Sequence, residues 1–324
     1  MLNIKINKNI STAPKTLFSP GHRGCAGCGQ MIAARLVADS LGSDTIIANA
    51  TGCLEVVTTP YPESSWGMPW IHSLFENAAA VASGIQAALK TQGKDKKIYP
   101  VKSGEAGAKL FDGVKVVAQG GDGGTFDIGF GLISGMWERG ENILYVCYDN
   151  EGYMNTGAQA SAATPWAANT TTTPAGTSPN INGIGSHFIK KDMLAIALAH
   201  GLKYVAQTTV AYPLDIIKKV KKAIATPGPS YLQILVPCIP GWKIEPNQTI
   251  NLAKLAVQTG IYSAVEYVNG QLTEVIKVSD QRPPVENYLK PQGRFKHLFK
   301  DKRGKEQIAY IQKLADENVK KYQL

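Results

Sequence analysis

The sequence predicts an α/β fold in which a mainly parallel sheet is flanked by helices. Short β-rich apolar runs alternate with segments whose apolar residues recur every three to four positions. This alternation is typical of parallel strands joined by crossover helices that cover both faces of the sheet. With 324 residues, 44% of them hydrophobic, the chain is long enough to bury a sizeable core.

Five runs rich in branched and aromatic residues are expected to be strands: residues 45–50, 114–119, 142–149, 204–210 and 230–236. Five amphipathic segments are expected to be helices: residues 30–41, 76–91, 126–138, 191–199 and 214–225. Two stretches break this pattern. Residues 93–112 form a Lys- and Gly-bearing insertion, and residues 156–186 are rich in Thr, Ala, Asn and Gly. Because long irregular loops are usually functional or disordered, we expect the second to be an ordered site or interface loop.

The C-terminal part has a different pattern. It predicts a helix near residues 250–259, a hairpin at Asn269-Gly270 and a charged helix over residues 305–322. We therefore divide the chain into a main domain, residues 1–260, and a C-terminal extension for subunit docking, residues 261–324.

The formal net charge of +9 comes from Lys-rich segments such as 217–223 and 295–305. Such segments are either solvated surface or a field that steers an acidic partner, for example an acidic electron carrier. They lack the Arg-and-aromatic stripe of nucleic-acid-binding proteins. The sequence has neither the apolar core of a signal peptide nor a run of 18 apolar residues. We expect a cytoplasmic protein without a nucleic-acid or membrane partner.

Four of the five cysteines form a candidate metal site. Cys25 and Cys28 form a CxxC pair, Cys53 follows 25 residues later, and Cys238 lies far downstream. Neighbouring glycines would let backbone amides approach the sulfurs, as an iron-sulfur cluster requires. Zinc and unliganded thiols are the alternatives, although a zinc ribbon normally has two local CxxC pairs. Cys147 lies inside a predicted strand and is interpreted as a core residue.

A second candidate site begins at Gly121-Asp122-Gly123-Gly124, between a predicted strand and a helix. This arrangement presents backbone amides to a phosphate group. Asp122 would repel a diphosphate unless a divalent cation lay between them, so it predicts Mg²⁺. Twenty-eight residues later the next strand ends before Asn150 and Gly152, whose side-chain and carbonyl oxygens could complete the site. A GDG alone could be an ordinary loop, whereas the pair of motifs is far more specific.

The pair of motifs, together with the four cysteines, resembles the 2-oxoacid:ferredoxin oxidoreductase family, and is most similar to the beta subunit of its pyruvate enzyme. The stretches that carry the resemblance cover roughly residues 18–300: GHRGCAGCG, ATGCLEVVTTPYP, PWIHSLFENAAAVASG, GGDGGTFDIG, YDNEGYMNTG, TTTTPAG and QGRFKH.

The resemblance implies a thiamine-diphosphate-binding domain of the pyrophosphate type. It implies that Cys25, Cys28, Cys53 and Cys238 hold one 4Fe-4S cluster, and that Asp122, Asn150 and the Gly152 carbonyl hold Mg²⁺. It places six residues around the cofactor, among them Asn155 as a catalytic candidate: Thr51, Gly121, Gly123, Gly124, Asn155 and Thr156. Asn150 departs modestly from members that have Thr there, but either side chain offers the metal a neutral oxygen.

The resemblance also implies partners. The expected ones are an alpha subunit with the pyrimidine-binding domain, gamma and delta subunits or domains with further clusters, and ferredoxin, with a 2-oxoacid and coenzyme A as substrates. The glutamate that activates the cofactor is expected on the partner subunit. Glu55 and Glu76 are candidates here, but ordinary structural roles fit them better, as they do the histidines: His22, His72, His187, His200 and His297.

Two other classes of function stay open. A non-redox thiamine-diphosphate decarboxylase or synthase would leave the four cysteines unexplained, and a structural metal-binding subunit would leave Asp122 and Asn150 unexplained. Within the family, pyruvate competes as substrate with oxalate, 2-oxoglutarate, branched-chain oxoacids and aryl-glyoxylates.

Overall fold

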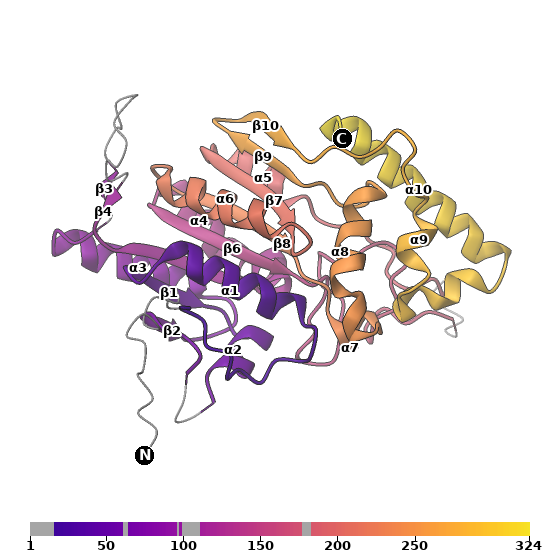
Figure 1. Ribbon diagram of the computed structural model, residues 1–324, viewed down its shortest axis with the longest axis horizontal. Helices are drawn as coiled ribbons and strands as arrows, with labels where there is room; N and C mark the ends of the chain where they lie inside the picture. Colours follow the sequence, from indigo (N-terminus) through magenta and orange to yellow (C-terminus); the bar gives the residue numbers. More distant parts are fainter. Residues whose placement is uncertain (1–15, 61–63, 96, 99–110, 177–182) are drawn as a thin grey trace, which may run out of the picture.

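The computed structural model describes residues 16–60, 64–95, 97–98, 111–176 and 183–324. Its centre is an eight-stranded sheet with the order β10-β9-β7-β8-β6-β5-β1-β2 (Figure 1). Six adjacent strands of this sheet run parallel to one another: β1 (Thr45–Asn49), β2 (Trp70–His72), β5 (Lys115–Gly121), β6 (Ile143–Asp149), β7 (Tyr204–Thr209) and β8 (Ser230–Leu235). The predicted mainly parallel α/β fold is confirmed.

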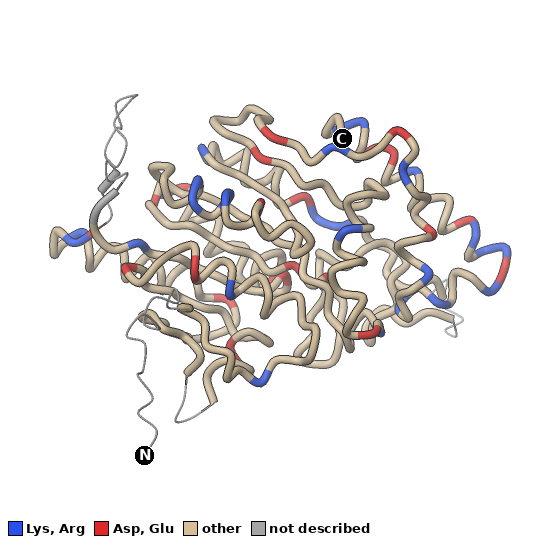
Figure 2. The backbone as a smooth tube through the Cα atoms, viewed as in Figure 1, with Lys and Arg blue, Asp and Glu red and all other residues tan. Residues whose placement is uncertain are grey.

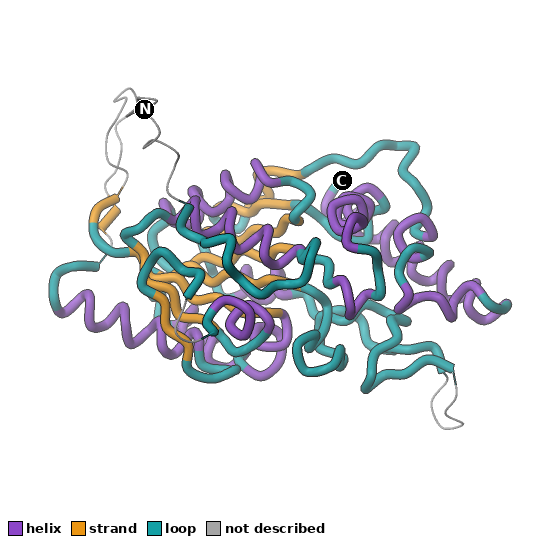
Figure 3. Tube along the Cα trace, turned by 60° about the horizontal axis from the view of Figure 1, so that its bottom comes forward, coloured by secondary structure: helices purple, strands orange, loops and turns teal. Residues whose placement is uncertain are grey.

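Helices cover both faces of the sheet (Figure 3). Helices α1 (Gly29–Leu41) and α6 (Pro213–Ala225) pack on one face, and α3 (Ala78–Thr91), α4 (Phe130–Glu138) and α5 (Met193–Ala199) pack on the other. Strand β6 divides its side chains accordingly. Leu144 and Val146 enter the first apolar core, whereas Tyr145 and Cys147 enter the second. Cys147 is fully buried, which confirms its interpretation as a core residue.

The five predicted strands and five predicted helices are all present, with shifted ends. The expected helix over 126–138 is two pieces: a wide helical turn over Gly123–Ile128, in which Gly129 N donates to Gly124 O, and then α4. The expected helix at 191 begins at Met193, because Asp192 caps it by accepting a hydrogen bond from Ala195 N. Sequence reasoning missed short elements without clear periodicity: α2 (Cys53–Thr58), β2, α7 (Ile239–Trp242) and α9 (Glu286–Leu289).

Helix α8 (Thr249–Gln258), the hairpin of β9 (Val265–Val268) with β10 (Gln271–Val275), and α10 (Lys302–Tyr322) match the pattern predicted for the C-terminal part. Strand β9 pairs antiparallel with β7, so the expected extension begins inside the main sheet. Helices α9 and α10 lie at one side of the sheet (Figure 1), where they build a third apolar core with α8. The division at residue 260 stays a prediction.

The two irregular stretches differ. Most of the 93–112 insertion lies outside the described residues; its described part includes the short pair β3 (Lys97–Ile98) and β4 (Phe111–Asp112). The described part of the 156–186 loop is packed against the core, with Ala163, Ala167 and Ala168 fully buried. The described part is therefore a packed loop, and residues 177–182 lie outside the described residues.

Charged residues are spread over many elements (Figure 2). Several lysines form ion pairs with acidic residues, for example Lys222 with Glu266 and Lys321 with Asp192. Among the described helices, none is both long and apolar enough to span a lipid bilayer.

The core assignment predicts the effect of shortening one side chain. Leu232, in β8, is 0% exposed, whereas Leu214, on α6, is 79% exposed. We expect Leu232→Ala to lower the free energy of unfolding by about 2–5 kcal/mol, because it removes buried methyl groups and leaves a cavity. Leu214→Ala should change it by less than about 0.5 kcal/mol. Urea denaturation followed by circular dichroism measures both, and equal losses would contradict the assigned core.

Candidate functional site

The two predicted oxygen-rich motifs meet at one edge of the sheet. Strands β5 and β6 are parallel neighbours, with Gly121 opposite Tyr148. Asp122 follows β5 and Asn150 follows β6, so both leave the sheet at adjacent carboxyl ends. Asn150 N donates to Asp122 Oδ1 over 3.1 Å. The structure thus brings together residues that are 28 positions apart in the sequence.

Three oxygen-bearing groups converge here. The end of the Asn150 amide lies 2.8 Å from the Gly152 carbonyl oxygen and 2.9 Å from Asp122 Oδ1. An amide nitrogen at that point donates hydrogen bonds to both. An amide oxygen there would instead form part of a cation site, since adjacent ligands of octahedral Mg²⁺, at 2.0–2.1 Å from the metal, stand roughly 3 Å apart. Asp122, Asn150 and Gly152 could therefore hold such an ion.

Asp122 is completely buried and accepts a hydrogen bond of 2.5 Å from Ser161 Oγ. Burial, and next the negative charge of Asp149, raise the pKa of the Asp122 carboxyl to about 8. A divalent cation beside the carboxylate would act in the opposite direction, by stabilising its ionised form.

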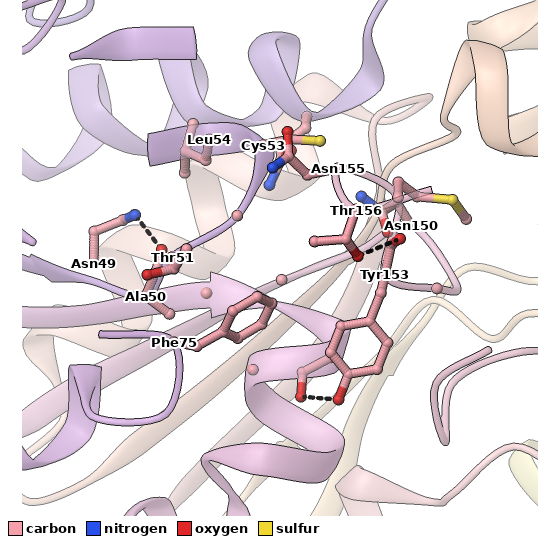
Figure 4. Close-up of a pocket in the computed structure, with 18 residues that line it drawn as sticks. Asn49, Ala50, Thr51, Cys53, Leu54, Phe75, Asn150, Tyr153, Asn155 and Thr156 are labelled. Atoms are coloured by element: carbon pink, nitrogen blue, oxygen red, sulfur yellow. Dashed lines mark hydrogen bonds between the residues drawn. The ribbon is translucent and has the colours of Figure 1, made fainter. Parts of the chain in front are cut away.

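A small pocket of about 30 Å³ opens beside this edge (Figure 4). All six residues predicted to surround a cofactor line it: Thr51, Gly121, Gly123, Gly124, Asn155 and Thr156. Cys53, Asn150 and Gly152 line it as well. Sites that enclose a small molecule measure roughly 300–1,000 Å³, so this pocket would hold only part of one.

Tyr153 and Phe75 form a wall of the pocket, with ring centroids 5.7 Å apart (Figure 4). The Tyr153 hydroxyl donates to Gly123 O over 3.2 Å. A Cβ atom on Gly123 would lie 2.4 Å from the tyrosine ring, so glycine is required here. The wide turn that begins at Gly123 leaves its first backbone amides without acceptors inside the helix, as an anion site needs.

The four predicted cysteine ligands lie where separate elements begin. Cys28 precedes α1, Cys53 opens α2, and Cys238 lies between β8 and α7. Gly29 N donates to Pro237 O over 3.3 Å, and Thr249 Oγ1 donates to Gly27 O over 2.6 Å. These contacts hold the CxxC turn against the segment that carries Cys238.

The cysteine sulfurs influence one another. Burial, and next the charges of Cys28 and Cys25, raise the pKa of the Cys53 thiol to about 12. Burial raises the pKa of Cys238 to about 12 as well, although the Gly241 amide, which hydrogen-bonds its sulfur, acts to lower it. The Met31 and Gln30 amides hydrogen-bond the Cys28 sulfur in the same way. Backbone amides directed at sulfur are what a cluster or a metal thiolate site would use.

Within the described residues, no three His, Cys, Asp or Glu side chains converge as they would around a single metal ion. The geometry therefore leaves iron-sulfur cluster, zinc site and free thiols as separate chemical alternatives for the cysteines.

The histidines and glutamates considered from sequence have structural contacts. His72 Nε2 lies 2.6 Å from Thr51 Oγ1, and its Nδ1 lies 4.0 Å from Glu55. His72 thus links Glu55 to Thr51, which lines the pocket. Neither these two residues nor Glu76 is among those that line the pocket. His200 contacts Ser134, and His297 contacts the Ile184 carbonyl.

Sequence reasoning missed the buried ion pairs behind the site. Lys190 Nζ lies 2.5 Å from Asp149 and 3.1 Å from Glu151, and Arg294 Nη2 lies 2.6 Å from Glu151. Burial opposes ionisation of Glu151, but Lys190 and Arg294 outweigh it and lower its pKa. In the sequence, Arg294 is marked only by the stretch QGRFKH, one of those that carry the family resemblance. Glu151 and Lys190 also line a second cavity of about 470 Å³, between the sheet and α10.

Comparison with known proteins identifies the family. Residues 50–234 match the model for the thiamine pyrophosphate enzyme, C-terminal TPP binding domain, which is the thiamine-diphosphate-binding domain. The chain is 50% identical to the pyruvate synthase subunit PorB of Methanosarcina barkeri, over 97% of this chain and 99% of that protein. It is 50% identical to PorB of Methanocaldococcus jannaschii (94% and 95% covered). It is 42% identical to the ketoisovalerate oxidoreductase subunit VorB of Pyrococcus abyssi (88% and 86% covered).

A solved structure shares the fold: the 2-oxoglutarate:ferredoxin oxidoreductase from Magnetococcus marinus, with a TM-score of 0.54 and 23% identity over 76% of this chain and 82% of that one. The thiamine pyrophosphate enzyme domain, matched at residues 50–234, includes β5, β6 and the turns after them. Residues of these turns line the pocket. Because it carries this domain and resembles PorB along nearly its whole length, the chain belongs to the PorB family of 2-oxoacid oxidoreductase subunits, within the thiamine pyrophosphate enzymes.

Proposed function

We propose that this chain is the beta subunit of a coenzyme A-dependent 2-oxoacid:ferredoxin oxidoreductase that acts on pyruvate. The observation that carries the proposal is the pocket at the ends of β5 and β6. It is lined by Asn150, whose backbone amide donates to Asp122, and by Cys53, one of the four predicted cysteine ligands. A non-redox thiamine enzyme would need only the first of these features, and a structural metal-binding subunit only the second.

In this proposal Asp122, Asn150 and the Gly152 carbonyl hold Mg²⁺. The amides of the turn at Gly123 and Gly124 receive the diphosphate, and Thr51, Asn155 and Thr156 border the cofactor. The approach of the Asn150 amide to the Gly152 carbonyl oxygen, at 2.8 Å, and to Asp122 Oδ1, at 2.9 Å, supports the metal assignment. When bound, thiamine diphosphate supplies the carbanion chemistry that releases carbon dioxide from a 2-oxoacid. The chain itself orients the diphosphate and keeps the Asp122 side away from water, since Asp122 is fully buried.

We assign one 4Fe-4S cluster to Cys25, Cys28, Cys53 and Cys238, where it would accept single electrons. The amides at the Cys28 and Cys238 sulfurs support this assignment, because hydrogen bonds to sulfur tune cluster potentials. Cys53 lines the same pocket as Asn150 and Gly152, so the proposed cysteine and metal sites are near each other. Such proximity is what electron transfer between the two sites would require.

The site is incomplete in this chain. The described pocket is far smaller than a whole cofactor site, and no glutamate is among its described lining residues. Large apolar side chains are exposed on elements that border it, which suits a covering subunit: Val56, Ile71, Leu74 and Ile128. We propose that an alpha subunit supplies the pyrimidine-binding half and the activating glutamate, and that gamma and delta subunits and ferredoxin carry electrons onward. Docking through residues 261–324 and a cytoplasmic location complete the proposal.

Pyruvate is favoured over branched-chain oxoacids because two pyruvate synthase subunits are 50% identical to this chain, whereas the ketoisovalerate subunit is 42% identical. The first test is anaerobic visible absorption of the purified complex, with iron, sulfide, zinc and thiamine diphosphate quantified in one sample. We expect a broad iron-sulfur band that pyruvate bleaches, together with bound cofactor. Zinc without sulfide would rule out the oxidoreductase.

Asp122→Ala should weaken thiamine diphosphate binding at least about 100-fold, because it removes a direct ligand of the metal. Iron content should be unchanged, since no thiolate is lost. Equilibrium dialysis with Mg²⁺ measures the first quantity, and elemental analysis the second. Asp280→Ala, at an exposed position, is the matched control and should bind normally. Full cofactor binding by Asp122→Ala would refute the magnesium assignment.

Cys238→Ala should lower iron and sulfide content or change the visible and electron paramagnetic resonance spectra, because it removes one of four ligands. Cys147→Ala is the control: that thiol is buried in the core and should leave both quantities unchanged. Normal iron stoichiometry and spectra in Cys238→Ala would mean that the fourth ligand is another residue.

A further inference from the structure

The stretch Gln292-Gly293-Arg294 reaches the proposed metal loop from the C-terminal part of the chain. Arg294 is 2% exposed, and its Nη2 donates to Glu151 Oε2 over 2.6 Å, although the two residues are 143 positions apart. Glu151 stands between Asn150 and Gly152, the residues that would bring their oxygens to the ion. The guanidinium thus contacts the loop next to both proposed ligands without reaching the ion itself.

Every residue of this stretch contributes to the placement of the guanidinium. Gln292 Oε1 accepts from Arg294 Nε over 2.8 Å, while Gln292 Nε2 donates to Tyr288 O over 2.6 Å. Gly293 N donates to Lys243 O over 3.1 Å, and a Cβ atom on Gly293 would lie 2.6 Å from Lys243 Cβ. Only glycine allows this close approach. These contacts therefore fix the orientation of the Arg294 side chain independently of Glu151.

Trp242 connects the same guanidinium to the loop backbone. The Arg294 guanidinium carbon lies 3.9 Å from the centre of the Trp242 ring, and Trp242 Nε1 donates to Asn150 O over 2.8 Å. Arg294 therefore acts on Asn150 through the indole and on Glu151 through the ion pair. A lysine could keep the charge but not the planar stacking.

Glu151 needs such support because of its backbone. Its φ is +67°, in the left-handed region that non-glycine residues rarely adopt. This conformation turns the chain so that the Asn150 amide and the Gly152 carbonyl come within 2.8 Å of each other. Lys190 and Arg294 hold the Glu151 carboxylate, and Thr164 Oγ1 donates to its carbonyl over 3.0 Å.

Resting on the proposed magnesium role of Asn150 and Gly152, we propose that Arg294 is a positioning residue of the metal site. Through Glu151 and Trp242 it holds the 150–152 loop in the conformation that presents two oxygens to Mg²⁺. The competing role is charge balance alone, in which Arg294 would only neutralise the buried Glu151. The two roles differ in what happens when both charges are removed together.

The experiment measures the Mg²⁺ concentration at half-saturation of thiamine diphosphate binding, in the assembled complex, for Arg294→Met, Arg294→Lys and the double variant Arg294→Met/Glu151→Gln. Outer residues that orient ligands typically contribute 10–100-fold to metal affinity. We expect Arg294→Met and the double variant to need at least about 10-fold more Mg²⁺, and Arg294→Lys to be intermediate. Iron content should stay normal. The double variant removes the Glu151 carboxylate together with its Arg294 partner, so it keeps the test valid if Arg294→Met does not fold.

Arg282→Met is the matched control. Arg282 also ties the C-terminal part to the rest of the chain, through Thr259 O, and pairs with Asp316, but it does not contact the loop. Its Mg²⁺ requirement should be unchanged. If the double variant binds Mg²⁺ within about twofold of the unmodified complex, Arg294 only balances charge and the positioning role is refuted. The absence of Mg²⁺-dependent cofactor binding in the unmodified complex would refute the proposed function itself.

Discussion

The structure around the pocket depends on how buried negative charge is compensated. Asp122, Asp149 and Glu151 are all buried, and two cations, Lys190 and Arg294, pair with the last two. One negative charge remains. Lys190 is 2.5 Å from Asp149, so Asp122 is the carboxylate that carries the excess, and burial raises its pKa to about 8. A proton or a cation must supply the missing charge, and the neighbouring oxygens of Asn150 and Gly152 suit a divalent cation.

The same region joins two sites that the sequence keeps far apart. Cys238 precedes the short helix α7, and Trp242, at the end of that helix, hydrogen-bonds the Asn150 carbonyl. Trp242 N donates to Cys238 O over 2.9 Å, so one helical turn separates the cysteine backbone from the indole. A single rigid turn thus fixes the distance between the cysteine site and the oxygen site. For a proposed electron-transferring enzyme, a fixed distance matters as much as the identity of the ligands.

Sequence reasoning predicted the fold and the pocket because both are encoded locally. Alternating apolar runs gave the strands, and in parallel strands the carboxyl ends necessarily meet, which brought Asp122 to Asn150. The ion pairs behind the site could not be predicted in this way. Arg294 and Glu151 are 143 residues apart, and no local pattern reveals that an arginine will be buried. Residues 126–128 were predicted as the start of an α-helix, but they are the end of the wide turn over Gly123–Ile128.

Buried ion pairs are weak evidence for stability. The free-energy cost of transferring two charges from water into the protein interior is close to the free energy that their attraction contributes. The Glu151 pairs therefore need another explanation, particularly since Glu151 itself has a left-handed backbone. A strained backbone conformation persists only where several surrounding contacts hold it in place. Such conformations are most common at functional loops. Here four contacts, from Lys190, Arg294, Thr164 and Trp242, fix two consecutive residues between β6 and the pocket. These contacts are therefore better explained by the oxygen positions that they fix in the loop than by a contribution to stability.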